Sequence, residues 1–295
     1  MWRRIQVLLL FLAPLALMAG LYAFGLTLPV PQLGRSYVIR VELPKAGQPV
    51  DLPTVLGPPD RSRPLVVIDA GHGGHDPGAS YDGIQEKNLA LGLALALRDR
   101  LLAQGGIRVA LTRSDDTFLA LEEREDIARR LGADLFLSIH ADSAGEESGI
   151  TGASVYTLSE KASDTGSAQL AERENSADEV NGVSLAGRSD AVNAILLSLS
   201  QRHTQEQSSE FARLIVREGA GALQFHPDPL RSANFVVLRA PDVPSALFEA
   251  GFVTNPQDAQ RLASPAGRES FADVMERAIR IYFARASGMA GQITG

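Results

Sequence analysis

The chain contains no cysteine among its 295 residues. This absence excludes disulfide bonds, cysteine nucleophiles and thiolate metal ligands. Any metal ion would therefore have to be held by imidazole nitrogen and carboxylate oxygen. Hydrophobic residues make up 45% of the chain, which is enough to build one sizeable core.

Outside one segment, the acidic and basic residues of the chain balance, so that segment carries the whole net charge. Residues 143–210 contain eleven acidic and four basic side chains, a net charge of −7 that equals the formal charge of the whole chain. The rest of the chain is therefore balanced, and we expect no nucleic-acid partner. Most of these acidic side chains are expected to form a solvated face, as charge runs usually do.

The N-terminus predicts export. Arg3 and Arg4 precede an uncharged stretch, residues 6–34, that contains two long apolar runs. A charged start followed by an apolar region is typical of a signal peptide, and about 20 apolar residues also suffice for a membrane anchor. We therefore expect residues 1–28 to be either a signal peptide or an anchor in the inner membrane, and the protein to be periplasmic.

Three apolar segments lead into polar side chains of the kind that form active sites. The first runs into a glycine-rich loop that carries His72, the second ends near His140, and the third carries Glu249 directly before Ala-Gly. In an open α/β sheet, the carboxyl ends of parallel strands line one edge, where ligands usually bind. Glu86 begins a helix that must pack back onto the first strand, which brings its carboxylate to the same edge.

Strand and helix patterns alternate along the chain. This alternation predicts an α/β fold with a single mostly parallel (mixed) twisted sheet of about six strands, helices on both faces, and a helical insertion. Besides the three strands above, the expected elements are helices at residues 86–104, 119–131 and 264–286 and strands at residues 107–112, 151–158 and 234–240.

The four polar side chains at the predicted sheet edge fit the requirements of a catalytic zinc site. Such a site needs three protein ligands, an open fourth position for water and a nearby base. Two histidines and one glutamate, with a second glutamate left unligated, supply this set. Taken singly, each residue has an ordinary alternative, such as a capping glutamate or a hydrogen-bonded core histidine.

The same segments, in this order and spacing, resemble the zinc-dependent N-acetylmuramoyl-L-alanine amidases of the cell-division type. The matching stretches are IDAGHGGHDPGA, the helix start at Glu86, LTRSDD with the later ADLFLSIHAD, and ALFEAGFVTNPQDAQRL. The resemblance implies that His72, Glu86 and His140 hold Zn²⁺ and that Glu249 is the general base for the attacking water. It also implies that peptidoglycan is the substrate, cut between N-acetylmuramic acid and L-alanine to split the septal wall.

The resemblance also suggests how the chain is divided. It covers roughly residues 64–287, the expected catalytic domain, and residues 288–295 are expected to be a flexible tail. Residues 29–63 are rich in proline and turn formers and predict a linker with a short strand at residues 37–43. The family often carries a separate wall-targeting module in front of the enzyme, and about 35 residues are too few for one.

Three more residues near the motifs are candidates for supporting roles. His75 could assist the scissile carbonyl or bind substrate, although a loop histidine beside a ligand is more often solvated. Asp142 and Asp69 could accept the second N–H of a ligating imidazole, which is the usual way to fix its orientation; Asp69 could equally cap the loop. Glu249 has apolar neighbours that predict a raised pKa, and its alternative partner is Arg261.

The acidic segment contains two expected helices, at residues 169–180 and 191–201. The first resembles a regulatory helix of division amidases, in which one glutamate occupies the open zinc position of the resting enzyme. Glu174 follows Leu170 by four residues on one helix face, so it is the expected metal plug, with Glu172 as the second candidate.

A periplasmic activator protein is the expected partner of the 143–210 insertion. It would pull the plug aside through the apolar face at residues 192–199. The alternative is an amphipathic helical hairpin packed for stability alone.

Two other functions remain open from the residues themselves. A zinc carboxypeptidase, or another amidohydrolase of the same architecture, would be expected to have an arginine that clamps a terminal carboxylate and no autoinhibitory insertion. A non-catalytic wall-binding protein of the division site would not need His72, Glu86, His140 and Glu249 to be intact.

Overall fold

The computed structural model of the protein describes residues 52–143, 150–176, 179–180, 183–184 and 194–293. The expected signal or anchor and the expected strand in the linker lie outside these residues. The first two residues of the apolar face expected to contact an activator also lie outside them, and the side chains of the rest of that face are not described. Within the described part of the chain, no helix is both long enough and apolar enough to cross a membrane.

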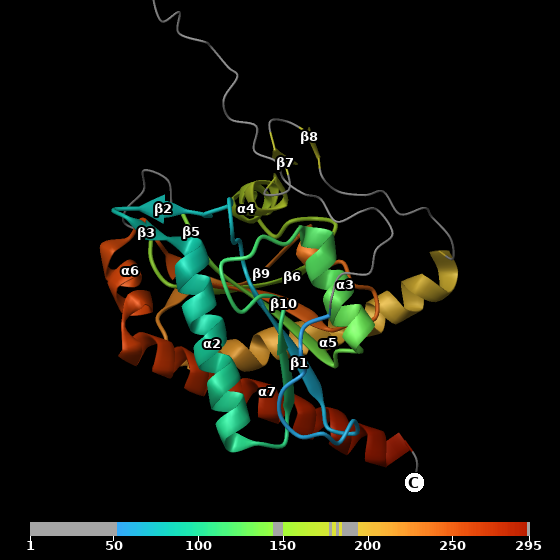
Figure 1. The fold of residues 1–295 in the computed structure, drawn as a ribbon. Helices are drawn as coiled ribbons and strands as arrows, with labels where there is room; N and C mark the ends of the chain where they lie inside the picture. The colour runs from blue at the N-terminus through green and yellow to red at the C-terminus, as the bar shows by residue number, and fades with distance from the viewer. Residues whose placement is uncertain (1–51, 144–149, 177–178, 181–182, 185–193, 294–295) are drawn as a thin grey trace, which may run out of the picture. The chain divides into compact units, whose positions relative to one another are not determined.

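A sheet of six strands, in the order β4-β1-β5-β10-β6-β9, forms the centre of the described fold (Figure 1). The first four strands run parallel, and β6 is antiparallel to β10 and parallel to β9. The predicted mixed, mostly parallel sheet is thereby confirmed. The strands are β1 (Leu65–Ala70), β4 (Arg108–Leu111), β5 (Leu135–Asp142), β6 (Ala153–Leu158), β9 (Phe225–Ala233) and β10 (Ser245–Phe252).

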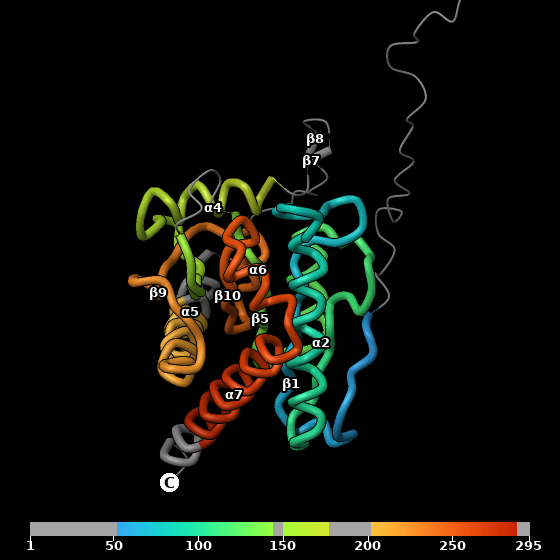
Figure 2. The backbone as a smooth tube through the Cα atoms, turned by 90° about the vertical axis from the view of Figure 1, so that its left-hand side faces the viewer, coloured from blue at the N-terminus to red at the C-terminus, as the bar shows by residue number. Residues whose placement is uncertain are grey.

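Helices cover both faces of this sheet, as the alternating pattern predicts. One face packs against α2, α5, α6 and α7, and the other packs against α3 and α4. Of these, α2 and α7 lie side by side (Figure 2). The helices are α2 (Glu86–Gln104), α3 (Leu121–Leu131), α4 (Thr165–Asn175), α5 (Ala194–Gly219), α6 (Pro256–Ala263) and α7 (Pro265–Ile293).

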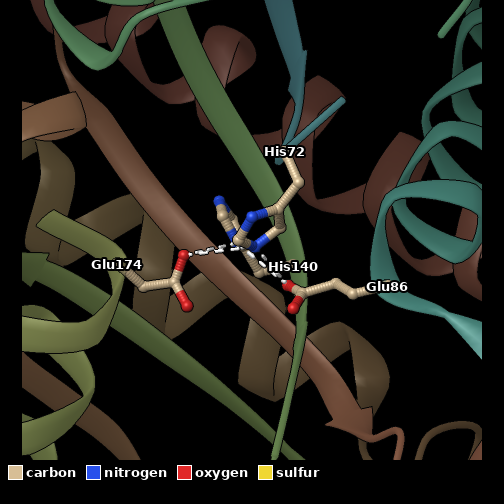
Figure 3. Close-up of side chains that lie close together, drawn as sticks. All are labelled: His72, Glu86, His140 and Glu174. Atoms are coloured by element: carbon tan, nitrogen blue, oxygen red, sulfur yellow. Dashed lines mark hydrogen bonds and ion pairs between the residues drawn. The ribbon is translucent and has the colours of Figure 1, made fainter. Parts of the chain in front are cut away.

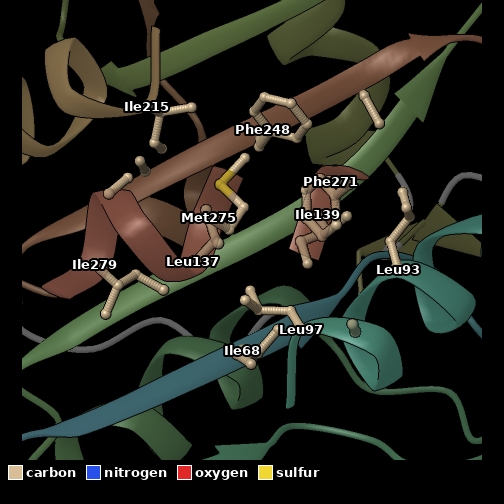
Figure 4. Packing of buried hydrophobic residues seen from close by; sticks show 14 of the residues in the cluster. Ile68, Leu93, Leu97, Leu137, Ile139, Ile215, Phe248, Phe271, Met275 and Ile279 are labelled. Carbon is tan, nitrogen blue, oxygen red and sulfur yellow. The ribbon is translucent and has the colours of Figure 1, made fainter. Parts of the chain in front are cut away.

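Strand β1, the second strand of the sheet, is buried on both sides, and its residues alternate between two cores. Val66 and Ile68 face the larger core, which is filled by side chains of α2, α5 and α7 (Figure 4). Leu65 and Val67 face the smaller core beneath α3 and α4. This two-sided burial explains why β1 is a continuous apolar run rather than an alternating one.

Helix α2 fixes one of the candidate site residues at its first position. It begins at Glu86 and ends at Gln104, as predicted, and Gly105 follows with a φ of 66°. The helix is held to the sheet by four buried leucines at intervals of four residues: Leu89, Leu93, Leu97 and Leu101. Because this stripe docks on β1, the helix start must lie beside the end of that strand.

One predicted strand is wrong. Residues 234–240 contain a short 3₁₀ helix, η2 (Val236–Leu238), and the strand lies before it as β9. Pro227 and Pro229 weaken the strand signal of β9, and prolines are tolerated there because β9 is at the edge of the sheet.

The acidic segment is more closely joined to the core than an insertion would be. Its strand β6 is part of the central sheet. Helix α5, expected at residues 191–201, continues to Gly219 and packs Phe211 and Ile215 into the larger core. At the C-terminus, α7 extends through Ile293 and so includes most of the residues predicted as a tail. Two short hairpins complete the described elements: β2 (Ser80–Tyr81) with β3 (Ile84–Gln85), and β7 (Glu179–Val180) with β8 (Val183–Ser184).

Candidate metal centre and active site

His72 lies in the loop after β1, in a backbone conformation that few residues other than glycine adopt. Its φ is 59°, in the left-handed region. Strain of this kind persists only where the surroundings hold a residue in place, and it is common at functional sites. The Nδ1–H of His72 donates to Asp76 Oδ2 at 2.7 Å. Since a carboxylate can only accept, Nε2 is the ring atom left to act as a ligand.

Glu86 and His140 approach His72 from two other elements. Glu86 Oε1 lies 3.0 Å from His72 Nε2 and 3.0 Å from His140 Nδ1. The main-chain N–H groups of Ala79 and Ala141 donate to the Glu86 carboxylate at 2.8 and 2.9 Å. The three side chains are buried together at the carboxyl edge of the sheet.

Two glycines permit this close approach. A Cβ atom on Gly71 would lie 2.4 Å from the His140 ring. On Gly78 it would lie 2.6 Å from Glu86 Oε2 and 2.7 Å from the His72 ring. The glycine-rich character of this loop is therefore a packing requirement of the site.

A fourth donor comes from α4. Glu174 Oε2 lies 3.3 Å from His72 Nε2 and 3.1 Å from His140 Nδ1 (Figure 3). Leu170 and Glu174 are both buried, whereas Glu172 is exposed, as the four-residue spacing predicts. Of the two glutamates considered for this position, the structure brings only Glu174 to the cluster.

The four donor atoms have the geometry of a tetrahedral metal site. His72 Nε2, His140 Nδ1 and one oxygen each of Glu86 and Glu174 lie within 4.8 Å of one another. Five of the six distances between these atoms, all except that between the two carboxylates, are 3.0 to 3.3 Å, and a tetrahedron with bonds of about 2.0–2.1 Å has edges of about 3.3 Å. Glu174 Oε2 has no hydrogen-bond partner although two imidazoles adjoin it. A buried oxygen that lies close to two ligand nitrogens and is hydrogen-bonded to neither fits a shared cation.

The charges of the cluster favour a cation at its centre. Burial opposes a charge on His140, but the carboxylates of Glu174 and Glu86 outweigh it and raise the pKa of His140 to about 10. The pKa of His72 is also raised well above its usual value, against burial, by Glu86 and Glu174. Conversely, burial would raise the pKa of Glu86, but the two imidazoles lower it to about 2. The site therefore binds positive charge, either as protons or as a metal ion.

Glu249 has the environment expected of a general base. It lies on β10 directly beside His140 of β5. Both of its carboxylate oxygens are buried without a hydrogen-bond partner. Burial, followed by the nearby charge of Asp142, raises the pKa of Glu249 well above its usual value. The alternative ion pair with Arg261 is not formed, because Arg261 binds Asp258 at 2.6 Å.

The other two candidate acidic residues bind partners different from the predicted imidazoles. Asp142 Oδ1 accepts from Arg173 of α4 at 2.6 Å, and burial, only partly offset by Arg173, raises its pKa to about 6. Asp69 accepts from Thr112, Ser138 and Arg124. These bonds replace the predicted bonds to an imidazole.

The imidazole acceptor role predicted for Asp69 and Asp142 belongs to Asp76 instead. The Asp76 carboxylate accepts from His72. Only its position four residues after His72 could have indicated this in the sequence. His75 is exposed and packs on Phe118 with ring centroids 4.1 Å apart.

A sequence pattern for the N-acetylmuramoyl-L-alanine amidase family matches residues 66–280. This span includes His72, Glu86, His140 and Glu249. The chain belongs to this family. The amidase is therefore a peptidoglycan hydrolase, and the predicted relation to the cell-division type is confirmed.

Related sequences and a solved structure align with about the same share of this chain. The amidase is 39% identical over 224 residues to N-acetylmuramoyl-L-alanine amidase AmiA of Salmonella typhimurium, covering 75% of this chain and 77% of the relative. It is 30% identical to the sporulation-specific N-acetylmuramoyl-L-alanine amidase of Bacillus subtilis, covering 76% and 71%. The catalytic domain of CwlV from Bacillus (Paenibacillus) polymyxa superposes with a TM-score of 0.55 at 28% identity, covering 75% of this chain and 98% of that domain.

Proposed function

We propose that this amidase binds zinc through His72, Glu86 and His140 and uses Glu249 to hydrolyse the amide bond between N-acetylmuramic acid and L-alanine. The observation that carries the proposal is the set of donor atoms with tetrahedral spacing, beside a buried carboxylate that has no partner. We further propose that the enzyme acts on septal peptidoglycan and that Glu174 keeps it inactive until an activator displaces α4.

The donor set favours zinc over the common alternatives. Two imidazoles and carboxylate oxygens at tetrahedral spacing suit Zn²⁺, whereas Mg²⁺ and Ca²⁺ prefer six or more oxygen ligands. Soft metals that require thiolate are excluded because the chain has no cysteine.

The catalytic roles of the protein side chains follow from their positions. Zinc, when bound, supplies a Lewis acid that polarises the scissile carbonyl and lowers the pKa of water. Glu249 accepts the proton of the attacking water and returns it to the leaving amine. Its raised pKa suits the first transfer, because a more basic carboxylate accepts a proton more readily. Asp76 holds His72 in the orientation that presents Nε2.

The contacts of α4 support the proposed inhibition. Glu174 takes the fourth position of the tetrahedron, the position that substrate and water need. Leu170 packs the helix against the smaller core. Asn175 anchors its end by donating to Asn234 O and accepting from Val236 N, both at 2.8 Å. The helix must therefore leave, or at least shift, before substrate can enter.

The proposal is tested by measuring the zinc content of the protein and by identifying the products that it releases from sacculi. We expect about one zinc per chain, loss of sacculus hydrolysis after chelation, and recovery when Zn²⁺ is returned. The assay should include Glu174→Ala protein, in which the site is open. Mass spectrometry should find stem peptides that begin with a free L-alanine amine. Cleavage within the peptide would instead support the carboxypeptidase alternative, and a zinc-loaded protein with no hydrolysis in either form would support the non-catalytic one.

Arg173→Ala should raise basal turnover by a modest factor of about two to five. Its ion pair with Asp142 joins α4 to β5 at 2.6 Å, but the Arg173 side chain is half exposed, so the pair contributes at most about 1 kcal/mol. The measurement is dye release from labelled sacculi without activator. Glu172→Ala is the matched control, because Glu172 lies on the exposed face of the same helix. Equal turnover in both variants would show that the ion pair does not hold the helix.

Zinc binding should release protons. The pKa values of His72 and His140 are both raised, so protons compete with the metal for the imidazole nitrogens, because only neutral imidazole can ligate. We expect proton release on zinc binding at pH 7 and an apparent affinity that rises with pH until these groups are neutral. Calorimetry in buffers of different ionisation enthalpy counts the protons. No release at pH 7 would contradict the proposed ligands.

Export and activation are proposed from the sequence and need their own tests. We propose that residues 1–28 direct the amidase to the periplasm, where peptidoglycan is exposed, and that an activator binds the 143–210 insertion. Fractionation of cells that express the full chain, followed by N-terminal sequencing, would distinguish a cleaved signal from an anchor. Recovery of the full chain in the cytoplasm would contradict export.

A further inference from the structure

Arg113 has a buried guanidinium that donates hydrogen bonds to four main-chain carbonyls. It follows β4 within the LTRSDD stretch and is 4% exposed. Its Nε donates to Ala70 O at 2.8 Å, and one terminal nitrogen donates to Asp115 O at 2.8 Å. The other terminal nitrogen donates to Gly71 O at 2.8 Å and to Lys87 O at 2.9 Å.

Three of these four carbonyls, those of Ala70, Gly71 and Lys87, belong to the two segments that present the proposed metal ligands. Gly71 directly precedes His72, and Lys87 directly follows Glu86. One planar group therefore ties the loop after β1 to the first turn of α2. The approach is close, because a Cβ atom on Gly73 would lie 3.0 Å from Arg113 Nε.

The neighbouring guanidinium does not make this connection. Arg124 is also buried and donates to Ala70 O and His72 O at 2.8 and 2.9 Å, but its other bonds go to Asp69 and Leu119. None of these partners lies in α2. Arg124 therefore joins the His72 loop to β1, while Arg113 joins that loop to the first turn of α2.

We propose that Arg113 is a positioning residue that holds His72 and Glu86 at ligand spacing and thereby sets the zinc affinity of the site. This inference rests on the proposed zinc ligands. Its physical basis is the rigid fork of arginine, whose donors leave one plane in fixed directions. Lysine would keep the charge but presents a single nitrogen on a flexible chain. It cannot satisfy the carbonyls of both segments with the same geometry, so the ligands would lose their fixed spacing.

Arg113→Lys should weaken zinc binding by about 10- to 100-fold, the range typical of residues that support metal ligands. Affinity is measured by competition with a zinc-binding dye. The matched control is Arg108→Lys, at the other end of β4. Arg108 also donates to main-chain carbonyls, those of Arg63 and Arg61 at 2.8 and 3.2 Å, but far along the strand from the ligands.

A second measurement separates positioning from general stability. Thermal unfolding is followed with chelator and with saturating zinc for the wild type and both lysine variants. A residue that only stabilises the fold would lower both midpoints equally. We expect the rise in midpoint on zinc addition to shrink for Arg113→Lys and to stay unchanged for Arg108→Lys.

The outcomes distinguish this inference from the proposed function. If His72→Ala binds zinc as tightly as the wild type, the proposed ligands are wrong. If His72→Ala loses affinity while Arg113→Lys retains it, only the role of Arg113 fails. Should Arg113→Lys not fold, zinc titration of the wild type followed by NMR replaces it. The Nε–H signal of Arg113 should then shift while that of Arg108 does not, and an unmoved Arg113 signal would overturn the inference.

Discussion

Glu249→Gln is expected to lower kcat by about 10²- to 10⁴-fold while zinc stays bound. The substitution keeps the shape of the side chain and removes its ability to take a proton, and general-base catalysis contributes a factor of this size. Glu249 is well placed to show the full effect, because it is buried and neither carboxylate oxygen has a hydrogen-bond partner. No hydrogen bond of its carboxylate is lost when it becomes an amide.

The experiment is best done in the Glu174→Ala background, so that the open site gives a measurable starting rate. Product formation on labelled sacculi and zinc content are measured together. Glu125→Gln is the matched control: Glu125 also has a buried oxygen without a partner, and burial raises its pKa to about 7, but it lies on α3. Near-normal turnover of Glu249→Gln would remove Glu249 from the mechanism. Loss of zinc would instead make it a metal-site residue.

Glu174→Ala is expected to raise basal turnover without activator by about 5- to 150-fold. This range corresponds to a coupling free energy of about 1 to 3 kcal/mol between helix docking and site access. The reason is geometric, since Glu174 Oε2 lies 3.1 and 3.3 Å from the two imidazole ligand atoms and fills the fourth position. Removing the carboxylate also removes the main attraction between α4 and the cluster.

Glu172→Ala provides the control, because this exposed glutamate is two residues away on the same helix. Zinc content must be measured in parallel, since the loss of a donor atom could reduce occupancy. If Glu174→Ala is fully loaded with zinc and its basal turnover is unchanged or lower, self-inhibition by Glu174 is wrong. A rise for both variants would point to general loosening of α4 instead.

Much of the architecture was predictable because it depends on short-range patterns. Helix α2 was predicted with its observed bounds, since leucines at intervals of four and a terminal glycine pair are local signals. Strands β1, β5 and β10 were predictable because strands buried on both faces are continuous apolar runs. Strand β9 was not, because two prolines weaken its pattern and only its edge position makes them acceptable.

The sequence by itself determined the family, the sheet architecture and the four polar side chains at its carboxyl edge, because strand ends and helix starts are encoded locally. It also indicated which glutamate of α4 faces inward, through the four-residue helical period. Only the tertiary structure decided the supporting contacts: Asp76 on His72, Arg173 on Asp142, and Arg113 between two ligand segments. These contacts depend on loop conformation or on distances between segments that are far apart in the chain. Neither can be inferred from the hydrophobic pattern of a single segment.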